Sequence, residues 1–232
     1  MRRGDEKRQA ILDVAERLFY LKGYEQTSVQ DVLDVLGSSK GSFYHHFESK
    51  HEVLQTLCQS RAEKALSQAE EALAQTGESL KRLNTLLYYA LPIREGEEQF
   101  LALLFPMIEK EDGRALLYEY ARALEAVFSP RLRPVLAQAG AERKAFLYYP
   151  AQAGQVLMAL LNQCWQSAAQ SLMDMHHQGG VADPGPLAEL IQAYRFAMER
   201  VLDAPYGSLE IISVPELTCT AQNVLIKMRL GQ

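Results

Sequence analysis

The 232-residue sequence has few cysteines, no long apolar run and no excess of basic residues. Cys58, Cys164 and Cys219 are odd in number and far apart, which argues against a disulfide framework and suits a reducing compartment. The longest apolar run, Phe100 to Ile108, contains Pro106 and is too short to span a bilayer. The first residues are charged and lack the hydrophobic stretch of a secretory signal. We therefore expect a cytoplasmic protein that does not enter the membrane.

Motifs for catalysis and for metal or cofactor binding are also missing. The sequence has no nucleophile elbow, zinc-protease pair or dinucleotide fingerprint, and its cysteines lack the spacing of zinc ligands. Residues 37–42 superficially resemble a phosphate-binding loop, but Lys40 precedes its glycine. The histidine pairs 45–46 and 176–177 are adjacent, so on a helix they point about 100° apart and chelate poorly. We expect no enzymatic activity, no metal and no cofactor.

Charge is unevenly distributed along the chain. The formal net charge is -5, yet residues 1–50 contain eight basic and eight acidic side chains, so the excess of acid lies beyond them. Attraction to a polyanion depends on where charges lie and not on their sum. The acidic total therefore does not exclude DNA as a partner.

Helical spacing of apolar residues recurs from end to end, which predicts an all-α fold. Turn residues divide the pattern, and Ser129-Pro130 is expected to end one helix, with a short piece confined by Pro134 and Gly140. We expect a domain at 1–50, a second domain at 51–204 and an extension at 205–232 that can form a short amphipathic helix. The predicted helices cover about 5–22, 29–36, 39–47, 49–75, 80–91, 97–110, 112–128, 150–178 and 186–203.

Two short predicted helices meet between Thr27 and Lys50. In the first, four apolar residues recur at i, i+3, i+4 and i+7, and the helix stops at Gly37. Ser38 and Ser39 can cap the second, whose Phe43 and Phe47 face back onto the first. Helices joined by such a tight turn form a helix-turn-helix, here about 28–47. Capping-box spacing predicts helix starts at Thr27 with Gln30 and at Ser49 with Glu52.

The outward side of the second helix carries hydrogen-bonding or cationic side chains: Lys40, Ser42, Tyr44, His45 and His46. A helix fits the major groove of DNA, where such groups meet base edges and phosphates. This helix is therefore the predicted recognition helix.

The same stretch resembles the DNA-binding domain of the TetR family of bacterial transcriptional regulators. Leu33 and Ser38 depart from the usual pattern, in which a small and an apolar residue stand there. The resemblance implies that Thr27, Lys40, Tyr44 and Lys50 hold phosphates, and that Ser39, Ser42 and His45 reach base edges or neighbouring phosphates. The matching positions are Arg8, residues 10–19, Gly23-Tyr24, residues 27–29, Asp31-Val32, Gly37, residues 39–42, Tyr44, Phe47 and Ser49-Lys50.

Aromatic and long apolar residues in the second domain can either line a ligand cavity or fill a packed core. The TetR resemblance implies a small effector in this domain and a homodimer formed through the last two long helices. The apolar side of the C-terminal extension must be covered by this protein or by a partner. The candidate pocket residues are Tyr88, Phe100, Leu104, Met107, Tyr120, Phe128, Met158 and Trp165.

These observations favour a ligand-responsive transcriptional regulator, most simply a repressor. It would bind a pseudo-palindromic operator in double-stranded DNA as a homodimer, and an unknown small-molecule effector would release it. The alternative is a cytosolic helical ligand carrier or interaction module in which the N-terminal motif does not read DNA. A salt-dependent affinity for duplex DNA would distinguish the two.

Overall fold

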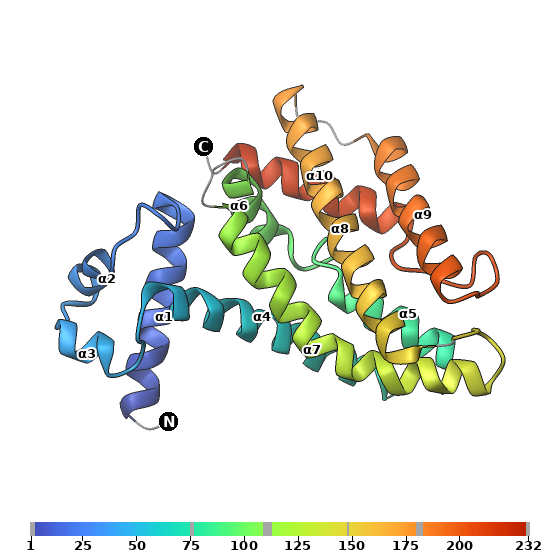
Figure 1. Ribbon diagram of the computed structural model, residues 1–232. Coiled ribbons are helices and arrows are strands. Elements are labelled where there is room, and N and C mark those ends of the chain that lie inside the picture. Colours follow the sequence, from blue (N-terminus) through green and yellow to red (C-terminus); the bar gives the residue numbers. More distant parts are fainter. Residues whose placement is uncertain (1–2, 75–76, 109–112, 148, 180–182, 231–232) are drawn as a thin grey trace. The chain divides into compact units, whose positions relative to one another are not determined.

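The computed structural model describes residues 3–74, 77–108, 113–147, 149–179 and 183–230 (Figure 1). All regular elements in these ranges are α-helices, so the predicted all-α fold is confirmed. The helices are α1 (Arg3–Lys22), α2 (Val29–Leu36), α3 (Lys40–Tyr44), α4 (Lys50–Leu73), α5 (Ser79–Ala90), α6 (Glu98–Ile108), α7 (Gly113–Ala141), α8 (Pro150–His177), α9 (Pro184–Val201) and α10 (Val214–Leu230).

The chain forms two compact units. The first comprises Met1–Arg61 and Pro106–Ala123, and the second comprises Ala62–Phe105 and Leu124–Gln232. Helices α4, α6 and α7 therefore each contribute residues to both units. The predicted domain boundaries at residues 50 and 204 do not coincide with the limits of these compact units. The three domains 1–50, 51–204 and 205–232 therefore stay a prediction.

The first unit is built on the apolar side of α1. Ile11, Ala15 and Phe19 are almost fully buried there, and Val32 and Leu33 of α2 are buried with them. This arrangement follows the predicted helical stripes, since both helices hide one face and expose the other. Phe43 of α3 and Phe47 just after it are likewise about 1% exposed. The short helices α2 and α3 therefore owe their stability to a shared core.

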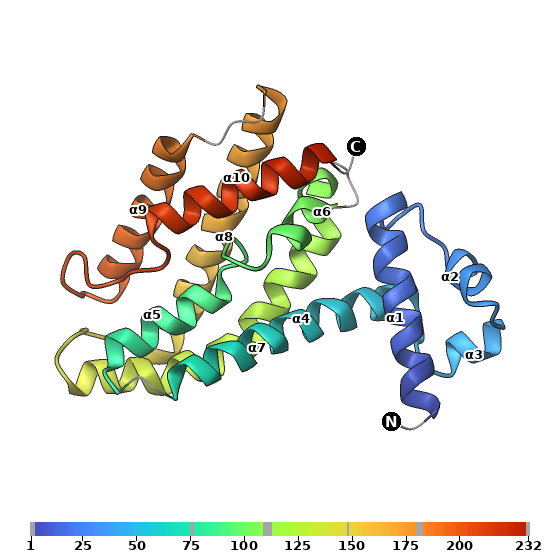
Figure 2. The same cartoon turned by 180° about the vertical axis from the view of Figure 1, so that it is seen from behind.

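In the second unit, α8 and α9 pack side by side (Figures 1 and 2). Trp165 of α8 is completely buried, and so are its small neighbours Ala168 and Ala169. Helix α10, over the stretch where an amphipathic helix is expected, packs on α9 and α8. Leu217, Ala221, Val224 and Leu225 are almost fully buried, so this same chain covers the apolar side of the extension.

Helix α7 corrects two predictions. It does not end at Ser129-Pro130, and Pro134 and Gly140 do not confine a separate piece, because the helix continues to Ala141. Both prolines lie on its exposed side, whereas Phe128, Leu132 and Leu136 are completely buried on the other. Each interior proline costs about 3 kcal/mol, and burying each large apolar side chain gains about 1.5–3 kcal/mol. The burial of this face is therefore large enough to offset the two interruptions.

Candidate nucleic-acid interface

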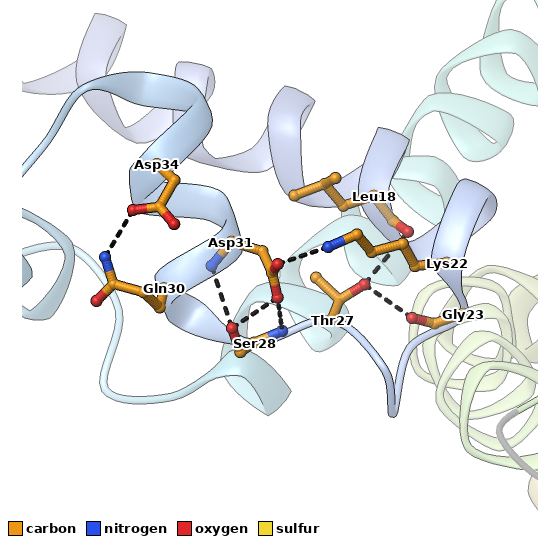
Figure 3. A network of polar contacts seen from close by, with 8 residues as sticks. All are labelled: Leu18, Lys22, Gly23, Thr27, Ser28, Gln30, Asp31 and Asp34. Carbon is orange, nitrogen blue, oxygen red and sulfur yellow. Dashed lines mark hydrogen bonds and ion pairs between the residues drawn. The ribbon is translucent and has the colours of Figure 1, made fainter.

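Helix α2 begins in a network of polar contacts around Ser28 (Figure 3). The Ser28 hydroxyl accepts from the Asp31 backbone N–H at 3.1 Å, and an Asp31 carboxylate oxygen accepts from the Ser28 N–H at 2.7 Å. The predicted capping box of Thr27 and Gln30 is therefore wrong by one residue, because Thr27 faces inward. The Gln30 side chain instead donates to the Asp34 carboxylate at 2.7 Å.

Thr27 itself is completely buried. Its hydroxyl lies 2.8 Å from the Gly23 carbonyl oxygen and 3.2 Å from that of Leu18, and both carbonyls accept from it (Figure 3). A hydroxyl has one proton, so none remains for a phosphate. The structure thus corrects the prediction that the Thr27 side chain holds a phosphate: it ties the end of α1 to the start of α2.

Asp31 connects the same two helices. Lys22, in the last turn of α1, donates to the Asp31 carboxylate over a distance of 2.5 Å (Figure 3). Hydrogen bonds from Lys22 and then from Ser28 hold the pKa of the Asp31 carboxyl well below its usual value. The carboxylate therefore stays ionised, and its charge at the N-terminal end of α2 also suits the helix dipole.

Gly37 and Ser39 make the turn between α2 and α3. Gly37 has a left-handed φ of 56°, which a residue with a side chain adopts only at a cost, and its N–H donates back to the last turn of α2. The Ser39 hydroxyl then accepts from the Ser42 N–H at 3.3 Å and caps α3. As an acceptor in this bond, the Ser39 hydroxyl keeps its own proton for donation outward.

The exposed side of α3 presents most of the predicted contact residues together. Phe43 and Phe47 are buried, while Lys40, Tyr44 and His45 are exposed and Ser42 is half-buried. Tyr44 is 56% exposed and lies edge-on to Phe43, with 5.4 Å between ring centroids. Buried phenylalanines fix the helix, and so its polar side chains share one outward surface.

Lys50 lies at the start of α4, and its ammonium group already makes hydrogen bonds within the unit. Its ammonium donates to the Tyr24 carbonyl oxygen at 2.7 Å and to the Glu25 carbonyl oxygen at 3.3 Å, and it lies 4.1 Å from the centroid of the Tyr24 ring. Two of its three protons are thereby used, and one remains for a phosphate. Beside it, Ser49 caps α4 by accepting from the Glu52 N–H at 3.1 Å, as predicted.

The sequence pattern does not predict that part of α7 belongs to this unit. The His51 ring lies 3.2 Å from the Glu119 carboxylate, whose other oxygen is 3.3 Å from Arg122. Glu119 is only 6% exposed. Residues 51 and 119 are too far apart in sequence for helical spacing to relate them, so no local signal could have revealed this pair.

The predicted pocket residues have different surroundings. Tyr88 lines an open pocket of about 510 Å³ in the second unit. Tyr120 is buried and belongs to the first unit, and the Met107 side chain lies outside the described residues. The others are at most 6% exposed: Phe100, Leu104, Phe128, Met158 and Trp165.

Comparison with known proteins relates this chain to regulators. Residues 11–57 match the sequence profile of bacterial regulatory proteins of the tetR family. The HTH-type transcriptional regulator YerO of Bacillus subtilis is 40% identical over 55 residues, 24% of this chain and 19% of YerO. The HTH-type transcriptional regulator TtgR of Pseudomonas putida is 38% identical over 58 residues, which are 25% of this chain and 28% of TtgR. The alignments thus span less than a third of these relatives' lengths.

A longer similarity exists in the fold. The transcriptional regulator FadR of Bacillus subtilis, solved in complex with stearoyl-CoA, aligns with a TM-score of 0.56 over 84% of this chain and 97% of FadR. Only 15% of the aligned residues are identical, so this comparison concerns the fold alone.

The buried phenylalanines, the capped helices and the exposed polar side of α3 define a helix-turn-helix domain of the DNA-binding kind. Residues 11–57 identify it as the TetR-type domain, and the resemblance of the chain to the TetR family is confirmed. Separately, no helix among the described residues is both long enough and apolar enough to cross a membrane.

Proposed function

We propose that this chain is a cytoplasmic transcriptional regulator that binds double-stranded DNA through α3. The outward surface of α3 carries the proposal: Lys40, Tyr44 and His45 are exposed together above a buried Phe43. Lys40, Tyr44 and Lys50 hold phosphates, while Ser39, Ser42 and His45 reach base edges or neighbouring phosphates. Thr27 is not among these contacts, because its hydroxyl is used inside the unit.

We infer that the regulator works as a homodimer on a pseudo-palindromic operator, since two recognition helices about 34 Å apart fit successive major grooves. Support comes from α8, where residues 150–173 contain no charged side chain although several are exposed. Phe196 of α9 and Val156 of α8 are exposed by 47% and 43%. Depletion of charge together with exposed apolar groups is typical of protein interfaces.

The fold similarity to regulators that bind small molecules supports an effector-controlled repressor. FadR of Bacillus subtilis was solved with stearoyl-CoA. An effector of the present chain must prefer one of two states to change its affinity for DNA, and such coupling is typically about 1–3 kcal/mol.

Titration of labelled duplex DNA at several salt concentrations tests the proposed function. For a regulator that neutralises phosphates, the logarithm of the association constant falls linearly with the logarithm of the salt concentration. Lys40→Ala should weaken binding to every DNA sequence and reduce the size of this slope by about one per subunit. Lys227→Ala in α10 is the matched control, because Lys227 is exposed but lies outside the helix-turn-helix. A slope near zero for the unchanged protein would instead favour a ligand carrier without DNA readout.

A further inference from the structure

An open groove of about 510 Å³ in the second unit lies between α5 and the segment that leads into α10. Helix α5 supplies Lys81, Thr85, Tyr88 and Tyr89, and the C-terminal segment supplies Glu210 and Glu216. The volume is within the range of small-molecule sites, about 300–1,000 Å³. The groove exists only because the chain continues beyond α9.

Two hydroxyl groups in the groove have already used their protons. The Tyr88 hydroxyl donates to a Glu216 carboxylate oxygen at 2.5 Å, and the Thr85 hydroxyl donates to the Lys81 carbonyl oxygen at 2.9 Å. Each hydroxyl oxygen can then only accept. A ligand that reaches these two oxygens therefore has to supply the donor itself.

The charges of the groove also favour a ligand that donates hydrogen bonds and carries positive charge. Glu210 and Glu216 both line it, whereas its one lysine, Lys81, has a 73% exposed side chain and lies 3.6 Å from Glu78. Arg94 lies close to Tyr88 but forms an ion pair with Glu97 at 3.0 Å. Two carboxylates against one solvated, paired ammonium leave an excess of negative charge.

Aromatic and aliphatic surface adjoins these acceptors. Tyr88 and Tyr89 lie edge-to-face, with 5.1 Å between their ring centroids, and Ile211 and Ile212 also line the groove. The faces of aromatic rings attract cations, and the Arg94 guanidinium already lies 5.2 Å from the centroid of the Tyr89 ring, which leaves the opposite face and the Tyr88 ring for a ligand. Carboxylates, hydroxyl acceptors and π-surfaces are thus concentrated in one place.

We propose that this groove binds a small organic cation, a primary ammonium attached to an aromatic or aliphatic body. The ammonium donates to the Glu216 carboxylate and to the Tyr88 oxygen, while the body contacts the Tyr89 ring and the isoleucines. Glu210 attracts the ligand from the rim. The inference concerns the free protein and goes beyond its binding of DNA, so a failure of either proposal leaves the other intact.

Isothermal titration calorimetry on the full chain without DNA tests the site. The probes are 2-phenylethylamine, which is cationic, and 3-phenylpropanoate, an anion with the same aromatic body. Saturable binding of the amine and none of the anion is expected. Equal binding of both probes, or no saturation by millimolar amine, would overturn the proposal.

Variants then locate the binding. Glu216→Gln should weaken amine binding about tenfold or more, because the acceptor of the ammonium loses its negative charge. Should that variant fold poorly, Glu210→Gln changes only an exposed side chain and should weaken binding about threefold. Glu189→Gln, an exposed carboxylate on α9, is the matched control. If neither groove variant binds more weakly than this control, the site is elsewhere and the proposal fails.

Discussion

The two units of this protein use local helix caps to different extents. In the first, Ser28, Ser39 and Ser49 cap α2, α3 and α4 through backbone groups three residues ahead. In the second, Asp183 caps α9 and the Ser213 hydroxyl accepts from the Glu216 N–H at the start of α10, but neither Glu78 before α5 nor Tyr149 before α8 makes a side-chain cap. The starts of α2, α3 and α4 are therefore fixed by local caps, whereas the starts of α5 and α8 are not.

The start of α5 illustrates the distant kind of support. Lys144 donates to the Glu78 carboxylate at 2.5 Å, and the buried Ser79 hydroxyl donates to Glu142 at 2.6 Å. Hydrogen bonds, first from Ser79, lower the pKa of the Glu142 carboxyl to about 2. These partners lie more than 60 residues away, so a capping rule applied to the sequence has nothing to recognise.

The largest expected effect tests whether local caps suffice without a shared core. Phe43→Ala empties a site that is 1% exposed and should lower the free energy of unfolding of the first unit by about 3–5 kcal/mol. Hydrogen exchange should show the loss in α2 and α3 even though Ser28 and Ser39 are unchanged. Phe146→Ala, at a 66% exposed phenylalanine, is the control and should be nearly neutral.

The next prediction concerns a contact in the second unit that joins α9 to the segment before α10. The carboxylate of Glu199 in α9 is completely buried and accepts from the Leu209 N–H at 3.1 Å. Glu199→Ala leaves this buried donor without its acceptor and should cost about 1–3 kcal/mol in chemical denaturation. Glu199→Gln keeps an acceptor and should cost less. Equal losses in the two variants would show that the hydrogen bond is not what holds this turn.

A matched pair of glycines sharpens the local side of the comparison. Gly37 has a φ of 56°, so Gly37→Ala should cost about 1–2 kcal/mol. Gly41 lies inside α3 with no atom nearer than 4.0 Å to an added methyl group, and Gly41→Ala should gain about 0.5–1 kcal/mol. Thermal unfolding measures both. Changes of the same sign would contradict the role assigned to the Gly37 turn.

The smallest expected effect is a pH dependence of stability that comes from Asp31 in the exposed capping box of α2. Because the pKa of Asp31 is lowered in the folded protein, its ionised form adds stability above the unfolded-state pKa of about 3.9. That contribution is lost as the pH falls through the lower folded-state pKa. Urea unfolding of the wild type and Asp31→Asn should therefore differ at neutral pH, and the difference should begin to shrink only as the pH falls below about 4. A difference that does not depend on pH would exclude the carboxylate as its source.

The same contrast explains what the sequence could predict. The buried sides of α1, α2 and α3, the stop at Gly37 and the outward position of Lys40 follow from spacing and turn chemistry. The inward position of Thr27 does not, because Thr27 and Ser28 are both good caps and only the packing of α1 on α2 selects between them.

Helix α7 shows the same limit from the opposite direction. Proline is the strongest local signal for ending a helix, yet Pro130 and Pro134 lie four residues apart on the exposed side, where water can satisfy the carbonyls they leave unpaired. The gain from burying Phe128 and Leu132 depends on contacts that only the folded chain provides. The groove beside α5 was missed for a similar reason, since Tyr88 and Glu216 are 128 positions apart.

Helix α10 also affects how the protein tolerates truncation. Leu217, Val224 and Leu225 are almost fully buried against the rest of the second unit. A chain that ends after α9 would therefore expose an apolar surface on α8 and α9. Such a shortened protein should precipitate or self-associate on expression, even though its N-terminal domain is complete.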